Sequence, residues 1–131
     1  MDVGLVLKCQ TCVICLQSQV YSCFVVDLFL PLRLYVMAHK FDVPALKLLA
    51  RDRFFYAAEL CWMNNESFPA VVDELYTTTS DTDVSMREIV YRLVGPNMLR
   101  HEHSARLEEV MRKHGDFAAA VMNHMPETQC L

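Results

Sequence analysis

The fold of this chain is decided by residues 34–60, which read LYVMAHKFDVPALKLLARDRFFYAAEL. Apolar side chains recur at steps of three or four residues on both sides of Asp42-Val43-Pro44, which is the spacing of amphipathic helices. A proline fits the first turn of a helix and pushes the residue before it out of the helical region. We therefore expect two helices. The first should end near Phe41 or Asp42, and the second should begin at Pro44 with the Asp42 carboxylate as its cap.

The same stretch resembles the end of a BTB/POZ domain, in particular that of fungal BTB-domain proteins. In that family a segment of the form YxxADKYDVPxLKxLAxxxF makes the last helical pair of the BTB fold, and residues 35–54 here read YVMAHKFDVPALKLLARDRF. Residues 67–79 (SFPAVVDELYTTT) and 113–122 (KHGDFAAAVM) are similar to the helical region that follows the domain in those proteins. The resemblance spans residues 32–125. His39 departs from it, since the family commonly has aspartate at this position.

The resemblance implies a non-enzymatic protein–protein interaction module. A full BTB domain has a body of strands and helices before this segment, and residues 1–32 do not resemble it. We therefore expect a truncated paralogue or a gene-model fragment, whose uncovered apolar helix face binds other proteins or a second copy. We assign no binding to cullin-type ubiquitin ligases, because the family's ligase-binding surface includes the absent core. The residues expected to bind a partner are Leu34, Tyr35, Phe41, Leu46, Leu49, Phe54 and Phe55.

Composition and charge argue against several classes of function. The 131 residues are 53% hydrophobic and 21% charged and carry a net charge of −4, which argues against an extended nucleic-acid-binding surface. Three glycines do not form the phosphate-binding or nucleophile loops of common enzymes, and the histidines form no metal motif. We expect no enzyme activity and no cofactor. We also expect a cytoplasmic or nuclear location, because the first residues lack the pattern of a secretory signal.

The remainder of the chain predicts further helices. Two sets of apolar residues follow the spacing of an amphipathic helix. They are Phe68, Val71, Val72, Leu75 and Tyr76, and then Met86, Ile89, Val90, Leu93 and Val94. With residues 34–60 they predict an all-α fold, a small bundle of about five to six amphipathic helices. We divide the chain into an uncertain segment (residues 1–32), a helical region (residues 33–125) and a frayed tail (residues 126–131).

Residues 1–32 are apolar and rich in cysteine, and they leave strand, helix and disorder open. The uncharged run of 18 residues at 9–26 includes six Gln, Ser or Thr side chains, so we expect no membrane span. Four cysteines in this region have the spacing of thiolate ligands for zinc or an iron–sulfur cluster, but the Val-Ile spacer between the second and third disfavours a tight turn. We therefore expect no metal at Cys9, Cys12, Cys15 and Cys23. The alternative function is a small membrane-associated or thiol- and metal-binding protein organised by residues 9–30.

Overall fold

The computed structural model describes residues 27–126, and within this range it contains six α-helices, one short 3-10 helix and no strand. The α-helices are α2 (Phe29–Lys40), α3 (Pro44–Cys61), α4 (Phe68–Thr78), α5 (Val84–Val94), α6 (His101–Lys113) and α7 (Gly115–Asn123). The 3-10 helix η1 (Gly95–Asn97) follows α5. The prediction of an all-α fold is confirmed.

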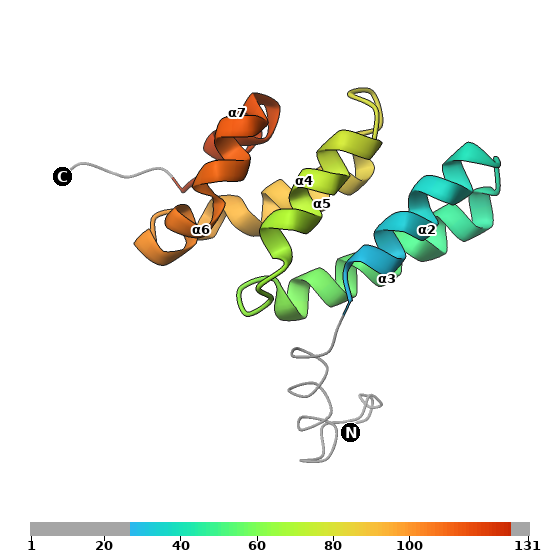
Figure 1. Cartoon of the computed structure of the whole chain (residues 1–131), viewed down its shortest axis with the longest axis horizontal. Coiled ribbons are helices and arrows are strands. Elements are labelled where there is room, and N and C mark those ends of the chain that lie inside the picture. The colour runs from blue at the N-terminus through green and yellow to red at the C-terminus, as the bar shows by residue number, and fades with distance from the viewer. Residues whose placement is uncertain (1–26, 127–131) are drawn as a thin grey trace, which may run out of the picture.

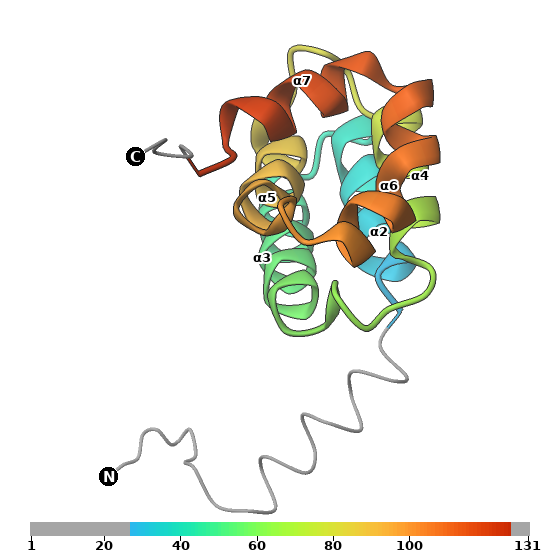
Figure 2. The same cartoon turned by 90° about the vertical axis from the view of Figure 1, so that its left-hand side faces the viewer.

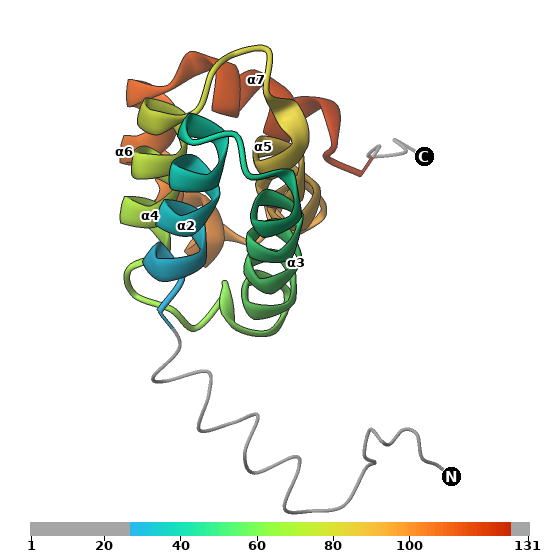
Figure 3. The same ribbon diagram turned by 90° about the vertical axis from the view of Figure 1, so that its right-hand side faces the viewer.

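The helices form three pairs that stack in chain order: α2–α3, α4–α5 and α6–α7 (Figure 1). One helix of each pair packs against one helix of the next pair. Helix α4 packs against both α2 and α6, and α5 packs against both α3 and α7. Figure 2 views the stack from the α6–α7 end, and Figure 3 views it from the α2–α3 end. The middle pair is therefore covered on both sides. Among the described residues, the first pair has helices packed on one side only.

The turn between α2 and α3 closes the first helix through its backbone. Asp42 has a positive φ of 55°. Its N–H donates to the His39 carbonyl at 3.3 Å, and the Val43 N–H donates to the Ala38 carbonyl at 2.9 Å. These two bonds form a Schellman motif, which satisfies the last carbonyl groups of α2. Pro44 is the first residue of α3, as predicted, but the predicted Asp42 cap is wrong, because this residue closes α2 and no side chain caps α3.

Helix α2 begins earlier than the sequence pattern predicts. Its first residue is Phe29, whose N–H donates to Asp27 Oδ1 at 2.9 Å. Pro31 is the third residue of the helix, where a backbone N–H has no partner inside the helix. The boundary expected at residue 33 therefore moves to residue 29, because this proline fits the first turn and does not interrupt it.

The core lies between the stacked pairs. Its largest fully buried side chains come from all three pairs and from the segment that leads into α2. They are Leu28, Leu32, Tyr35, Phe54, Phe68, Val71, Val72, Leu75, Met86, Leu107 and Phe117. All five residues of the predicted α4 stripe are buried, and in the α5 stripe only Leu93 is partly exposed. Spacing alone identifies the buried face well in these two helices, because each has a single apolar stripe.

Polar side chains tie each pair to the next. Between the first and second pairs, Arg33 donates to both carboxylate oxygens of Glu74 at 2.8 and 2.9 Å. Between the second and third pairs, Asp73 lies 2.7 Å from His114 Nε2 and 3.0 Å from Lys113 Nζ. The hydrogen bond from Arg33 lowers the pKa of Glu74, and the bonds from His114 and then Lys113 lower the pKa of Asp73. Because these groups are partly exposed, their ion pairs fix the relative orientation of the helix pairs more than they add to the free energy of unfolding.

A buried histidine on α6 departs from this pattern of paired polar groups. His103 is 5% exposed, and its ring centre lies 5.0 Å from that of Trp62. Neither ring nitrogen has a hydrogen-bond partner among the described residues, since the nearest carboxylate, that of Glu102, lies 3.9 Å from Nε2, beyond hydrogen-bond distance. Burial of an unsatisfied polar group costs free energy, because the bonds that water makes in the unfolded chain are lost.

Replacement of this histidine by leucine is therefore expected to stabilise the protein. We expect His103→Leu to raise the free energy of unfolding by about 1 kcal/mol, measured by urea denaturation followed by circular dichroism at neutral pH. The matched control is His114→Leu, which removes the hydrogen bond to Asp73 and is expected to lower stability. A loss of stability in His103→Leu would show that the buried imidazole has partners in solution.

Candidate functional site

The outer side of the first helix pair carries an apolar stripe on α2. Leu30, Leu34, Met37 and Phe41 follow one another at steps of four, three and four residues, which places them on one face of the helix. Leu30 is 60% exposed, Met37 53% and Phe41 65%, while Leu34 is partly buried. The opposite face of the helix supplies core residues, so α2 is apolar on two sides.

Helix α3 carries a matching stripe. Leu46, Leu49, Arg53, Ala57 and Leu60 follow one another at steps of three or four residues. Leu49 and Leu60 are each 50% exposed, and Leu46 is partly buried. Arg53 is the charged member of the stripe. The two stripes together form one surface, which we call the outer face.

A groove runs along the outer face between the two helices, with a cavity volume of about 320 Å³. Its lining is mostly aliphatic and comes from both helices. The lining residues are Asp27, Leu30, Pro31, Leu34, Leu46, Leu49, Ala50, Arg53 and Ala57. Half-exposed leucines around an open groove are typical of a surface that binds another protein, because monomeric proteins rarely expose a large contiguous apolar patch.

The residues expected to bind a partner do not all lie on the same surface of the structure. Leu34, Phe41, Leu46 and Leu49 lie on the outer face. Tyr35 and Phe54 do not, and their assignment to a contact surface is corrected: they are 1% and 0% exposed, because they point into the core toward the second pair.

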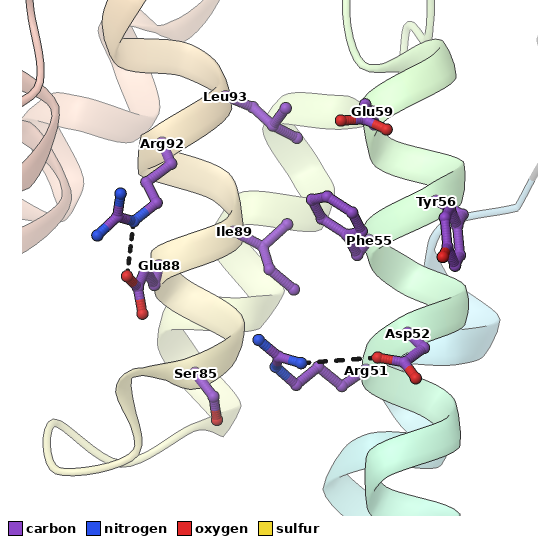
Figure 4. A pocket seen from close by; sticks show the side chains of 10 residues that line it. All are labelled: Arg51, Asp52, Phe55, Tyr56, Glu59, Ser85, Glu88, Ile89, Arg92 and Leu93. Carbon is purple, nitrogen blue, oxygen red and sulfur yellow. Dashed lines mark hydrogen bonds and ion pairs between the residues drawn. The ribbon is translucent and has the colours of Figure 1, made fainter.

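The last of the expected residues, Phe55, is partly buried beside a different hollow, which lies between α3 and α5 and has a cavity volume of about 550 Å³ (Figure 4). Four of the five charged groups drawn there pair along their own helices, and Glu59 is the fifth. Arg51 lies 3.6 Å from Asp52, and Arg92 Nε lies 2.6 Å from Glu88. Because these arginines already have carboxylate partners, the hollow concentrates no charge of one sign that would attract an ionic ligand.

The sequence reasoning missed the exposed Leu60 on α3, and it also missed two residues of the outer face on α2, Leu30 and Met37. The signal was present, since they lie four residues before and three residues after Leu34. Leu30 lies before the helical region expected from residue 33, although α2 begins at Phe29 and Pro31 fits its first turn.

A polar cluster beneath the outer face holds the first pair on α5. The Tyr35 hydroxyl lies 2.7 and 2.8 Å from the two carboxylate oxygens of Asp83 and 2.9 Å from Ser85 Oγ. Lys47 Nζ lies 3.6 Å from Asp83 and 5.2 Å from the centre of the Tyr35 ring. Burial raises the pKa of Tyr35 to about 12. Burial opposes ionisation of Asp83, but the hydrogen bonds from Tyr35 and Ser85 and the charge of Lys47 together lower its pKa.

From this cluster we predict that the stability lost in the variant Tyr35→Phe depends on pH. Tyr35→Phe is expected to cost about 1–2 kcal/mol of stability at neutral pH, because it removes a hydrogen bond to a carboxylate. Folding lowers the pKa of Asp83, so its contribution is complete above the ordinary value of 3.8 and is lost as the pH falls through the folded value. The penalty of Tyr35→Phe should therefore shrink as the pH falls below 3.8 and through the folded pKa of Asp83.

Urea unfolding of the natural chain and of the variant, at neutral and at acid pH, measures this difference. Asp73 and Glu74 also have lowered pKa values, but both proteins contain them, so their effect cancels in the comparison. An equal penalty at both pH values would contradict the role given to the ionised Asp83.

The cysteines considered as metal ligands, Cys9, Cys12, Cys15 and Cys23, lie outside the described residues. Within residues 27–126, no group of three or more His, Cys, Asp or Glu side chains is placed to hold a metal ion. None of the helices described is long and apolar enough to cross a membrane.

A comparison with known proteins finds no matching family model, curated protein or solved structure.

Proposed function

We propose that this protein is a non-enzymatic protein–protein interaction module that binds its partner through the outer face of α2–α3. The observation that carries the proposal is the exposure of apolar side chains along both helices, with Leu30, Phe41 and Leu49 each half exposed or more. Burial of such surface against a partner contributes about 25 cal/mol per Å² before the costs of association are subtracted. The fold supports this use, because the opposite face of the same helices is fixed on the second pair.

The proposal agrees with the resemblance of residues 32–125 to the end of a BTB/POZ domain and the helical region after it. In proteins of that kind the domain recruits other proteins or dimerises. We place this chain in the same class of function and in the cytoplasm or nucleus. We assign it no ligase binding, because the resemblance does not extend to the surface that would be needed.

Site-specific photo-crosslinking tests the proposal. A photoreactive amino acid is placed at Leu49 on the outer face, or at Leu99 as the control, since Leu99 is 58% exposed and lies between η1 and α6. After irradiation in cells, we expect protein adducts from position 49 and none from position 99, with the adducts identified by mass spectrometry. The absence of adducts from position 49, or equal adducts from both positions, would overturn the proposal.

A further inference from the structure

We infer that the partner on the outer face is an amphipathic α-helix of another protein, and that a carboxylate on the apolar side of this helix pairs with Arg53. The inference rests on the proposed function and adds the chemical class of the partner. It comes from the place of Arg53 among the leucines of the groove and from the way in which the helix pairs inside the stack cover one another.

Arg53 lies in the middle of the α3 side of the groove. Leu49 precedes it and Ala57 follows it by one helical turn, and all three residues line the groove. Arg53 is exposed and makes no hydrogen bond or ion pair with any described residue, whereas Arg51 lies 3.6 Å from Asp52. The apolar groove therefore presents a guanidinium group that no carboxylate of the described residues neutralises.

The other charged residue of the groove, Asp27, has a different role. It lies just before α2, where its Oδ1 accepts a hydrogen bond from the N–H of Phe29 at 2.9 Å. It lines the same groove as Arg53 but forms no ion pair with it. Its carboxylate supports the start of α2, so an anionic partner for Arg53 has to come from outside the described residues.

The two junctions inside the stack show how charges are matched between neighbouring helix pairs. Arg33 of the first pair donates to Glu74 of the second, and Lys113 of the third pair lies 3.0 Å from Asp73 of the second. At both junctions a cation of one pair meets a carboxylate of the pair that packs against it. The outer face, with Arg53 at its centre, is complementary in the same way to a covering element that supplies a carboxylate.

The backbone chemistry of the outer face favours a helix as that element. Helices α2 and α3 use their backbone groups internally, so an extended peptide on their aliphatic side chains would leave its own N–H and C=O groups unpaired. A helix satisfies these groups within itself. The opposite side of the same pair is covered in this way, since α4 packs on α2 and α5 packs on α3.

The groove has the length for about three turns of a helix. Its α3 side extends from Leu46 to Ala57, which corresponds to about 16 Å along the helix axis. Apolar residues of the partner at positions i, i+3 or i+4, and i+7 would contact the leucines, as in other complexes in which a helix lies in an apolar groove.

Arg53 makes the face selective among apolar helices. A helix with only apolar residues on its contact side would bury the guanidinium group without a partner, which costs free energy. A carboxylate at this position removes the cost through charge-assisted hydrogen bonds, whereas a lysine would add repulsion between like charges. The arginine therefore discriminates in favour of helices that carry an acidic residue on their apolar side.

Selection from displayed peptide libraries tests the inference. One library presents helices of about five turns with leucines along one side and all amino acids allowed at the positions beside them. A second library presents extended, proline-rich peptides. The target is the purified full chain in reducing buffer. We expect binders from the helical library, with Asp or Glu enriched by about tenfold at one of the varied positions.

A change of charge at position 53 tests the role of the arginine. On Arg53→Glu the preference should reverse, so that Lys or Arg is enriched at the same peptide position. The matched control is Arg100→Glu, because Arg100 is also exposed but lies between η1 and α6, and this variant should keep the preference for an acidic residue. Circular dichroism verifies that each variant keeps its helical fold.

Fluorescence anisotropy of one selected peptide measures the pair directly. Replacement of its acidic residue by the corresponding amide should weaken binding to the natural chain by about tenfold or more, and to Arg53→Gln by about twofold or less. Leu49→Glu should weaken binding of the original peptide by about a hundredfold, because it places a charge in the covered groove. Leu99→Glu places the same charge on an exposed leucine outside the face and should have no effect.

Several outcomes would overturn the inference. They are the absence of helical binders, stronger enrichment from the extended library, an acidic preference that Arg53→Glu leaves unchanged, and an equal effect of the amide on both chains. Photo-crosslinks from position 49 to residues 1–26 or to a second copy would also overturn it, because they would identify another occupant. Adducts with other proteins from position 49 without any helical binder would reject the helix and leave the proposed function standing. The absence of adducts from that position would reject the proposed function itself.

Discussion

Replacement of Phe54 by alanine is expected to remove about 3–5 kcal/mol from the free energy of unfolding. The Phe54 side chain is fully buried on the face of α3 that packs on the rest of the stack. Its truncation loses the transfer free energy of the ring and leaves a cavity where the first pair meets the core. Urea denaturation of the natural chain and the variant, followed by circular dichroism, gives the difference.

The matched control for this variant lies on the same helix. Leu49→Ala truncates a side chain that is half exposed on the outer face, so it should cost about 1 kcal/mol or less in dilute monomer. The contrast between the two substitutions measures which face of α3 is internal. Similar losses in both variants would contradict the orientation of α3, and with it the open outer face.

The second large effect is expected at Arg87, the one arginine that is buried among the described residues. Its guanidinium lies over the Tyr76 ring with its carbon 4.4 Å from the ring centre. It donates to the carbonyl of Thr79 at 2.8 Å and to that of Tyr76 at 3.3 Å, and its Nε donates to Thr79 Oγ1 at 3.0 Å. Tyr76 lies in the last turn of α4 and Thr79 directly follows the helix, at the end where a helix leaves its acceptors unsatisfied and favours a positive charge.

Arg87→Met keeps much of the apolar stem but leaves these carbonyl groups without their donor. We expect a loss of about 2–4 kcal/mol, because each unsatisfied buried acceptor costs free energy. The control is Arg112→Met, which removes an exposed arginine that pairs with Glu108 one turn earlier and should cost less than about 1 kcal/mol. Equal small losses in the two variants, measured by urea unfolding, would show that water replaces the Arg87 guanidinium at little cost.

The sequence predicts the positions of most helices because short-range rules govern them. Pro44 begins α3 as expected, since a proline has few other places in a helix. The stripes of α4 and α5 are buried as expected, since each helix has one apolar face and lies in the middle of the stack.

The candidate site could be predicted only in part, because α2 and α3 are apolar on two faces. Spacing shows that Leu34 and Tyr35 both lie on a helix, but it does not show which of them faces the core. That choice is made by contacts distant in sequence, such as the bond between Tyr35 and Asp83. The roles of Arg87 and His103 could not be predicted from the sequence either, since they depend on where the second and third helix pairs lie relative to their neighbours.

The stacking of three helix pairs has a consequence for how such a chain changes through evolution. Within residues 27–126 each pair contacts the pairs next to it in sequence, and no helix of this part is threaded between distant segments. A pair added or deleted at one end would disturb a single junction and leave the other junctions intact. The helix pair is therefore a modular unit of gain and loss, and an end face such as that of α2–α3 is the place where a lineage can extend the protein without rebuilding its interior.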